Sequence, residues 1–207
     1  GGIVKIWKKL PLVICVHTTV GTGSETALAA VIVDSKTRHK YTINDFNLIP
    51  DYAVLDPKPT LSLPPFITAC TGMDALSHAI EAYIGNSTTK KTRAYALKVT
   101  KLIFENIYKV YEDGNDLEAR SNMFDAAFYA GHAFTVSYVY VQAIAHSLGK
   151  KYNIAHGLTN ATLLDVVLKQ YGESVYKKLY EMACIVASVM RMIPIRLDLS
   201  VLLNKSL

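Results

Sequence analysis

Residues 65–84 of the chain, PFITACTGMDALSHAIEAYI, contain the pattern that decides the fold. Pro64 and Pro65 precede or open this stretch, and the fixed φ of proline suits the first turn of a helix. Apolar residues then recur at helical spacing, at Met73, Leu76, Ile80, Tyr83 and Ile84. Asp74, His78 and Glu81 share the other side. The stretch therefore predicts a helix with an apolar face and a polar stripe.

The sixty residues before this helix predict strands instead. Leu10–Val16 is an apolar, β-branched run typical of a buried strand, and it stops at the glycine-containing loop Thr18–Glu25. Ala30–Asp34 and Lys40–Asn44 flank a short polar connection and predict a hairpin. Tyr52–Leu55 predicts a further strand.

Helical periodicity continues after the decisive stretch. It runs through Ala96–Val110, Met123–Ala133 and Val141–Leu148, with a helix end expected at Gly149. The change of pattern near Leu61–Leu63 divides the chain into two expected domains, a strand-bearing one over 1–62 and a helical one over 63–207.

Composition narrows the function. Apolar residues make up 51% of the chain and charged ones 19%, as in a globular protein. The 22 Lys and Arg are scattered among 17 Asp and Glu, which argues against nucleic-acid binding. No apolar run approaches the length of a membrane span, and the first residues do not resemble a secretory signal. Cys15, Cys70 and Cys184 are expected to be buried free thiols in a reducing compartment, so we expect a cytoplasmic protein.

Two groups of residues could carry chemistry. Asp74 and His78 lie four positions apart, so both could ligate one divalent ion from a single helix face, or they could belong to a solvent-facing polar stripe. His146 and His156 form a second, histidine-containing segment. From their spacing alone, metal ligation and an ordinary core or surface position are equally open.

Together these segments resemble the iron-containing (group III) alcohol dehydrogenases. Pro65–Tyr83 resembles the ligand helix of that family, and Ala143–Gly149 with His156–Ala161 resembles its second metal segment. Thr18–Glu25, TTVGTGSE, resembles its cofactor loop. The resemblance implies an α/β remnant of a dinucleotide-binding domain followed by an all-α metal-binding domain, which is an incomplete dehydroquinate synthase-like architecture.

The resemblance also implies a ligand set. Asp74, His78 and His156 match three metal ligands of the family, and Gln142 stands where the family has the fourth, a histidine. A glutamine oxygen is a poorer donor to Fe²⁺ or Zn²⁺ than imidazole. His146 lies one helical turn beyond Gln142 and is the alternative fourth ligand; the family otherwise places it near the substrate, as a catalytic residue.

The cofactor residues implied by the resemblance are Thr18, Thr19, Val20, Gly21, Thr22 and Lys40. They would lie along NAD or NADP, with glycine permitting close approach and hydroxyls donating hydrogen bonds. The alternative is an ordinary tight turn with a solvated Lys40. His17 stands where the family has proline, and the family's glycine-rich pyrophosphate motif would precede this loop.

The implied activity is reversible oxidation of a primary alcohol to an aldehyde by a metal-dependent, NAD(P)-linked dehydrogenase, with a homodimer expected of complete relatives. One alternative is an inactive fragment or degraded paralogue that keeps the helical fold. Another is a zinc-dependent, glycerol-type polyol dehydrogenase. A third is a metal-binding or helical interaction module whose exposed apolar surface is covered by a partner.

Overall fold

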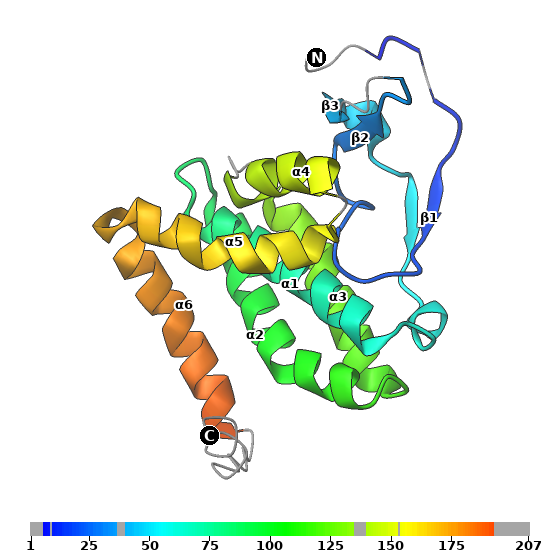
Figure 1. Cartoon of the computed structure of the whole chain (residues 1–207). Helices are drawn as coiled ribbons and strands as arrows, with labels where there is room; N and C mark the ends of the chain where they lie inside the picture. Colours follow the sequence, from blue (N-terminus) through cyan, green and yellow to red (C-terminus); the bar gives the residue numbers. More distant parts are fainter. Residues whose placement is uncertain (1–5, 9, 37–39, 135–139, 153, 193–207) are drawn as a thin grey trace.

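The computed structural model describes residues 6–8, 10–36, 40–134, 140–152 and 154–192. Its larger part is helical. The six helices of these ranges are α1 (Pro65–Ile84), α2 (Lys90–Glu112), α3 (Leu117–Phe134), α4 (Tyr140–Tyr152), α5 (His156–Tyr171) and α6 (Glu173–Met192). Figure 1 shows the helices on one side of the molecule and the strands on the other. None of the helices within the described ranges is long and apolar enough to cross a bilayer.

Helices α1, α2 and α3 form the core. The face of α1 that they bury carries the small residues Ala75, Ala79 and Ala82, which let neighbouring helices approach closely. Val99, Ile103 and Val110 of α2 and Met123, Phe124 and Ala126 of α3 fill the space between them. α5 crosses α1, α4 lies beside α5, and α6 packs against α2 (Figure 1).

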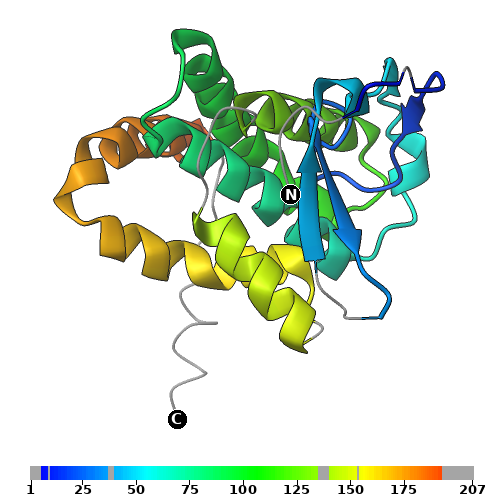
Figure 2. The same ribbon diagram turned by 90° about the horizontal axis from the view of Figure 1, so that it is seen from above.

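The strands form two separate pairs. The parallel pair joins β1 (Ile14–Val16) and β4 (Tyr52–Val54), whereas β2 (Ala29–Val33) and β3 (Lys40–Asn44) make an antiparallel hairpin. The hairpin predicted from the sequence is thus confirmed, with Ala29 opposite Asn44. Figure 2 shows it standing beside the helical body. Two short 3₁₀ helices, η1 (Phe46–Leu48) and η2 (Lys58–Thr60), lie in the connections.

Three expectations about local structure were wrong. The run Leu10–Val16 was expected to be a buried strand, but only Ile14–Val16 is a strand, and Ile14 and Val16 are 54% and 58% exposed. A strand paired on one side only has no second layer to bury it. Helix α4 does not end at Gly149 but continues to Tyr152. Among the free thiols Cys70 is buried, whereas Cys184 is exposed.

A close contact between α1 and α5 brings the two ligand segments together. A side chain at Gly157 would collide with the backbone carbonyl of Cys70. Only glycine therefore allows the first turn of α5 to lie directly on α1. His156, which begins α5, is placed by this contact beside the polar side of α1.

Candidate active site

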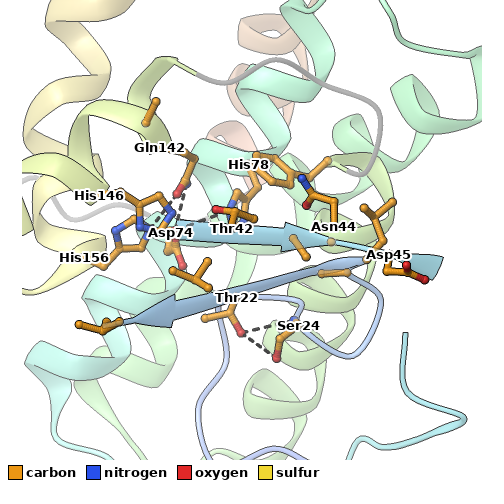
Figure 3. Close-up of a pocket in the computed structure, with 18 of the residues that line it drawn as sticks. Thr22, Ser24, Thr42, Asn44, Asp45, Asp74, His78, Gln142, His146 and His156 are labelled. Carbon is orange, nitrogen blue, oxygen red and sulfur yellow. Dashed lines mark hydrogen bonds and ion pairs between the residues drawn. The ribbon is translucent and has the colours of Figure 1, made fainter. Parts of the chain in front are cut away.

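A cavity of about 1020 Å³ lies between the helical body and the hairpin. Its polar wall contains the predicted ligand residues, and its other walls come from the loop after β1 and from β2 and β3 (Figure 3). The lining side chains that could bind a ligand through polar atoms include Thr22, Ser24, Asp74, His78, Gln142, His146 and His156. The fold thus collects polar groups from distant segments in one recess.

Helix α1 contributes Asp74 and His78. They are only 4% and 7% exposed, and Glu81 on the same stripe is 1% exposed, so the solvent-facing alternative is wrong. The Nε2 atom of His78 lies 3.8 Å from Oδ1 of Asp74, as expected for residues one turn apart. Burial lowers the pKa of His78, which keeps its imidazole neutral and its nitrogen a potential ligand.

Helix α5 places His156 close to the carboxylate of Asp74. Its Nε2 atom lies 3.7 Å from Oδ1 of Asp74. The ring stacks on that of His146 from α4, with centroids 4.6 Å apart and planes inclined by 24°. The structure therefore brings Asp74, His78, His146 and His156 together, as the resemblance of their two segments to one family's metal site implied.

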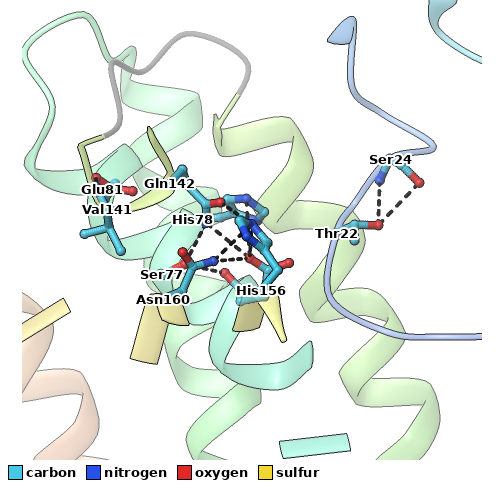
Figure 4. A network of polar contacts seen from close by, with 10 residues as sticks. Thr22, Ser24, Ser77, His78, Glu81, Val141, Gln142, His156 and Asn160 are labelled. Carbon is cyan, nitrogen blue, oxygen red and sulfur yellow. Dashed lines mark hydrogen bonds and ion pairs between the residues drawn. The ribbon is translucent and has the colours of Figure 1, made fainter. Parts of the chain in front are cut away.

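The side chain of Gln142 lies at the centre of this cluster, and its amide forms three hydrogen bonds (Figure 4). Its Nε2 donates to Oδ1 of Asp74 at 3.1 Å and to Oγ of Ser77 at 2.9 Å. Its Oε1 lies 2.7 Å from Nε2 of His156. The amide thus turns its nitrogen, not its oxygen, toward the carboxylate.

Asn160 is a site residue that the sequence analysis missed. Its Nδ2 donates to Oδ1 of Asp74 at 2.7 Å and lies 3.3 Å from Nε2 of His156. It follows His156 by four positions, so the two side chains share a face of α5. That i,i+4 spacing was the signal available in the sequence.

The donor set suits a divalent ion in part. One carboxylate oxygen and two imidazole nitrogens are ligands that Fe²⁺ and Zn²⁺ accept. Within the ranges that the structure describes, however, no three His, Cys, Asp or Glu side chains are arranged as a ready metal-ligand group. Hydrogen bonds from Gln142 and Asn160 hold the carboxylate instead. Asp74, His78 and His156 thus offer donor atoms of the right type without forming a ready ligand group, and Gln142 turns its NH₂ group toward the carboxylate.

Glu81 positions the helix that carries Gln142 and His146. Its Oε1 accepts the backbone N–H of Val141 at 2.8 Å, in the first turn of α4, where the backbone donors have no intrahelical partner. Burial raises the pKa of this carboxyl to about 7. The sequence placed Glu81 on the polar side of α1 but gave no sign of this partner, which lies 60 positions away.

The predicted cofactor residues are divided between the cavity and its surroundings. Thr22 lines the cavity, Val20 and Gly21 are buried, Thr18 is exposed and Thr19 is half-buried. Lys40 begins β3, but its side chain lies outside what the structure describes.

Two features fix the loop that carries Thr22. Gly23 has a φ of +56°, and a side chain there would lie 2.7 Å from Cα of Gly131, so the loop rests on the backbone of α3. Next to β1, Nε2 of His17 lies 2.8 Å from Oε2 of the buried Glu25. His17 therefore pairs one end of the loop with the other.

Comparisons with known proteins identify the family of the chain. Residues 68–194, more than half of the chain, match the model of the Fe-containing alcohol dehydrogenase family, C-terminal, and residues 2–57 match that of iron-containing alcohol dehydrogenase. Alcohol dehydrogenase 4 of Saccharomyces cerevisiae is 44% identical over 156 residues, which are 75% of this chain and 41% of the yeast protein.

Solved structures show the same fold. The alcohol dehydrogenase from Oenococcus oeni superposes with a TM-score of 0.87 at 34% identity over 90% of this chain and 49% of that one. Sulfoacetaldehyde reductase from Bifidobacterium kashiwanohense, solved in complex with NAD⁺, gives 0.77 at 27% identity over 96% and 57%. The chain thus spans less than half of the yeast protein and about half of these structures. It belongs to the iron-containing alcohol dehydrogenase family, as an incomplete α/β part followed by an all-α part of the dehydroquinate synthase-like fold.

Proposed function

We propose that the chain carries the catalytic part of a metal-dependent, NAD(P)-linked alcohol dehydrogenase that interconverts a primary alcohol and its aldehyde. The observation that supports this most is the convergence of Asp74, His78 and His156 on one wall of a cavity whose opposite side holds the loop with Thr22. These three residues would hold the ion, Fe²⁺ or Zn²⁺. When bound, the ion supplies Lewis-acid polarisation of the alcohol oxygen.

The remaining parts of the reaction fall to other residues of the cavity. Thr22 and the loop backbone would hold the nicotinamide end of the cofactor, with Thr18, Thr19, Val20, Gly21 and Lys40 along the rest of it. His146, stacked on His156, would contact the substrate. When bound, the nicotinamide would supply the hydride acceptor for the alcohol carbon, and His146 would be a suitable acceptor for the hydroxyl proton.

Strand β2 contributes Val31 and Val33 to the cavity wall, and β3 contributes Thr42 and Asn44. An apolar wall beside a polar cluster favours a small substrate with a hydrocarbon part and one hydroxyl or carbonyl group. Such a wall would also exclude water from the space beside the reacting carbon. The domain division at residues 62 and 63 remains part of this proposal: the first part would bind cofactor and the second would bind metal.

Hydride transfer by the purified chain tests the proposal. The chain is loaded with Fe²⁺ without oxygen, or with Zn²⁺, and mixed with NAD⁺ or NADP⁺ and 1-propanol, and nicotinamide reduction is followed by absorbance. We expect reduction that Asp74→Asn abolishes and that His146→Ala lowers with the ion still bound. A metal-loaded chain that binds the dinucleotide but reduces none would instead favour a non-catalytic member of the family.

A further inference from the structure

We propose that Gln142 is an internal substitute for the metal ion. Its amide ties Asp74 to His156 when no ion is present, and an ion must displace that amide to bind. The inference rests on the proposed function, because it concerns the metal site of the same cavity. It goes further in assigning this chain a site that is stable without metal and that takes up metal in competition with one of its own side chains.

The direction of the amide follows from its partners. The Oγ of Ser77 donates its proton to the backbone carbonyl of Asp74 at 2.8 Å, so it can only accept from Gln142. The carboxylate of Asp74 is also an acceptor. The group of Gln142 that faces both must therefore be the NH₂ group, and the oxygen of the amide must point the other way.

The amide oxygen of Gln142 forms a hydrogen bond with Nε2 of His156, the nitrogen that would have to coordinate an ion. Because Oε1 of Gln142 can only accept, Nε2 of His156 must be the donor in the 2.7 Å contact between them. The same Nε2 is the atom that lies 3.7 Å from the carboxylate. An ion bound there needs the lone pair of Nε2, so it cannot bind while this hydrogen bond exists.

Rotating the amide would not remove the conflict. A rotated Gln142 would place its oxygen against the carboxylate of Asp74 and its NH₂ group against His156, and the bonds to Asp74 and Ser77 would both be lost. Glutamine therefore cannot serve as a ligand in the place of the family's histidine without breaking the network that holds it. Glutamine at position 142 therefore does more than weaken one metal–ligand bond: it gives the site a hydrogen-bond network that competes with the ion.

Because it is buried, this network is an alternative to an ion. Gln142 is 3% exposed, and Ser77 and Asn160 are fully buried. Buried polar groups are costly unless they are bonded, and here the amides of Gln142 and Asn160 both donate to Oδ1 of Asp74. The carboxylate thus receives from two amides the compensation that a cation would supply.

Two substitutions separate an internal substitute from a weak ligand. Gln142→His restores an imidazole, whereas Gln142→Leu removes both the amide and any ability to coordinate. Zn²⁺, and Fe²⁺ without oxygen, are titrated into the metal-free chain and both variants by calorimetry, and thermal unfolding is measured with and without the ion.

We expect the histidine variant to bind about 100-fold more tightly than the parent, the scale on which neighbouring groups tune metal affinity. The leucine variant should bind at least as tightly as the parent, by up to about fivefold for one hydrogen bond no longer displaced. Without metal the parent should melt at the highest temperature, and the ion should raise the melting temperature of both variants more than that of the parent.

A tenfold weaker affinity of the leucine variant would show that the glutamine oxygen coordinates, and the proposal would be wrong. Absence of binding by all three proteins would also contradict it. If the leucine variant does not fold, Ser77→Ala replaces it, because this change keeps every ligand and removes one anchor of the amide. We then expect tighter binding, and weaker or unchanged binding overturns the proposal. Hydride transfer is measured separately, so tight binding without activity contradicts the proposed function alone.

Discussion

The predicted metal-ligand cluster and the predicted cofactor loop differ in how the fold holds them. Asp74, His78 and Gln142 are buried, and each is held by packing or hydrogen bonds from at least one other helix or from the loop. The loop between β1 and β2 has Thr18 and Thr22 exposed, and its anchors are a glycine on α3 and the pair of His17 with Glu25. The difference teaches that helix packing can gather polar residues into a buried cluster, whereas a loop between short exposed strands leaves its polar groups open to solvent.

Removing the central carboxylate should have the largest effect. Asp74→Ala leaves the amides of Gln142 and Asn160 buried without their acceptor, and we expect the free energy of unfolding to fall by about 4 kcal/mol and metal binding to disappear. Thr18→Ala, on the exposed loop, should change it by less than about 0.5 kcal/mol. Equal effects of the two changes in denaturant unfolding would remove the contrast between the regions.

The close approach of α5 to α1 should be the next most sensitive feature. In Gly157→Ala the new methyl group meets the carbonyl of Cys70, and we expect a loss of about 3 kcal/mol. Gly149→Ala, within helix α4, is the matched control, because the added atom would lie 3.4 Å from its nearest neighbour, the backbone oxygen of Ile154. It should stabilise the chain by up to about 1 kcal/mol. Thermal unfolding of both variants measures the two changes in stability. A destabilised Gly149→Ala variant would mean that α4 is not helical at Gly149.

Glu81 should make the stability of the chain depend on pH. Its folded-state pKa is raised from 4.5 to about 7, so the stability it contributes is fully present below about pH 4.5 and is lost as the pH rises through 7. Glu81→Gln cannot ionise and should lack this loss, so the parent should lose about 2 kcal/mol relative to the variant between pH 5 and pH 8. Urea unfolding across that range gives both values. A constant difference between the two proteins would show that burial does not shift this carboxyl.

The smallest effect should come from the loop. Thr22→Ala removes a hydroxyl that lines the cavity and bonds to Ser24, and we expect stability within about 0.5 kcal/mol of the parent. Affinity for NAD⁺ should fall by about fivefold, as for one lost hydrogen bond, while affinity for the metal stays the same. Calorimetry with each ligand separates the two. A variant that loses metal binding instead would place Thr22 with the ligand cluster and not with the cofactor.

Much of the fold was predictable because its signals are local. Helical spacing in residues 65–84 and the polar connection between the hairpin strands depend on neighbours a few positions away, and both predictions were confirmed. The exposure of β1 was not predictable, because a strand's burial depends on what packs against it. The expected end of α4 at Gly149 failed for a related reason, since tertiary packing overrides the weak preference of one glycine.

The sequence by itself determined which residue types are available at the site and that Asp74 and His78 share one turn of a helix. Only the tertiary structure decided how they are used. It brought Gln142 and Asn160 to Asp74 from 68 and 86 positions away. It also placed the carboxylate of Glu81, on α1, against the first turn of α4. The reason is that the donor and acceptor roles of a buried amide depend on all of its partners at once, and those partners meet only when the helices pack.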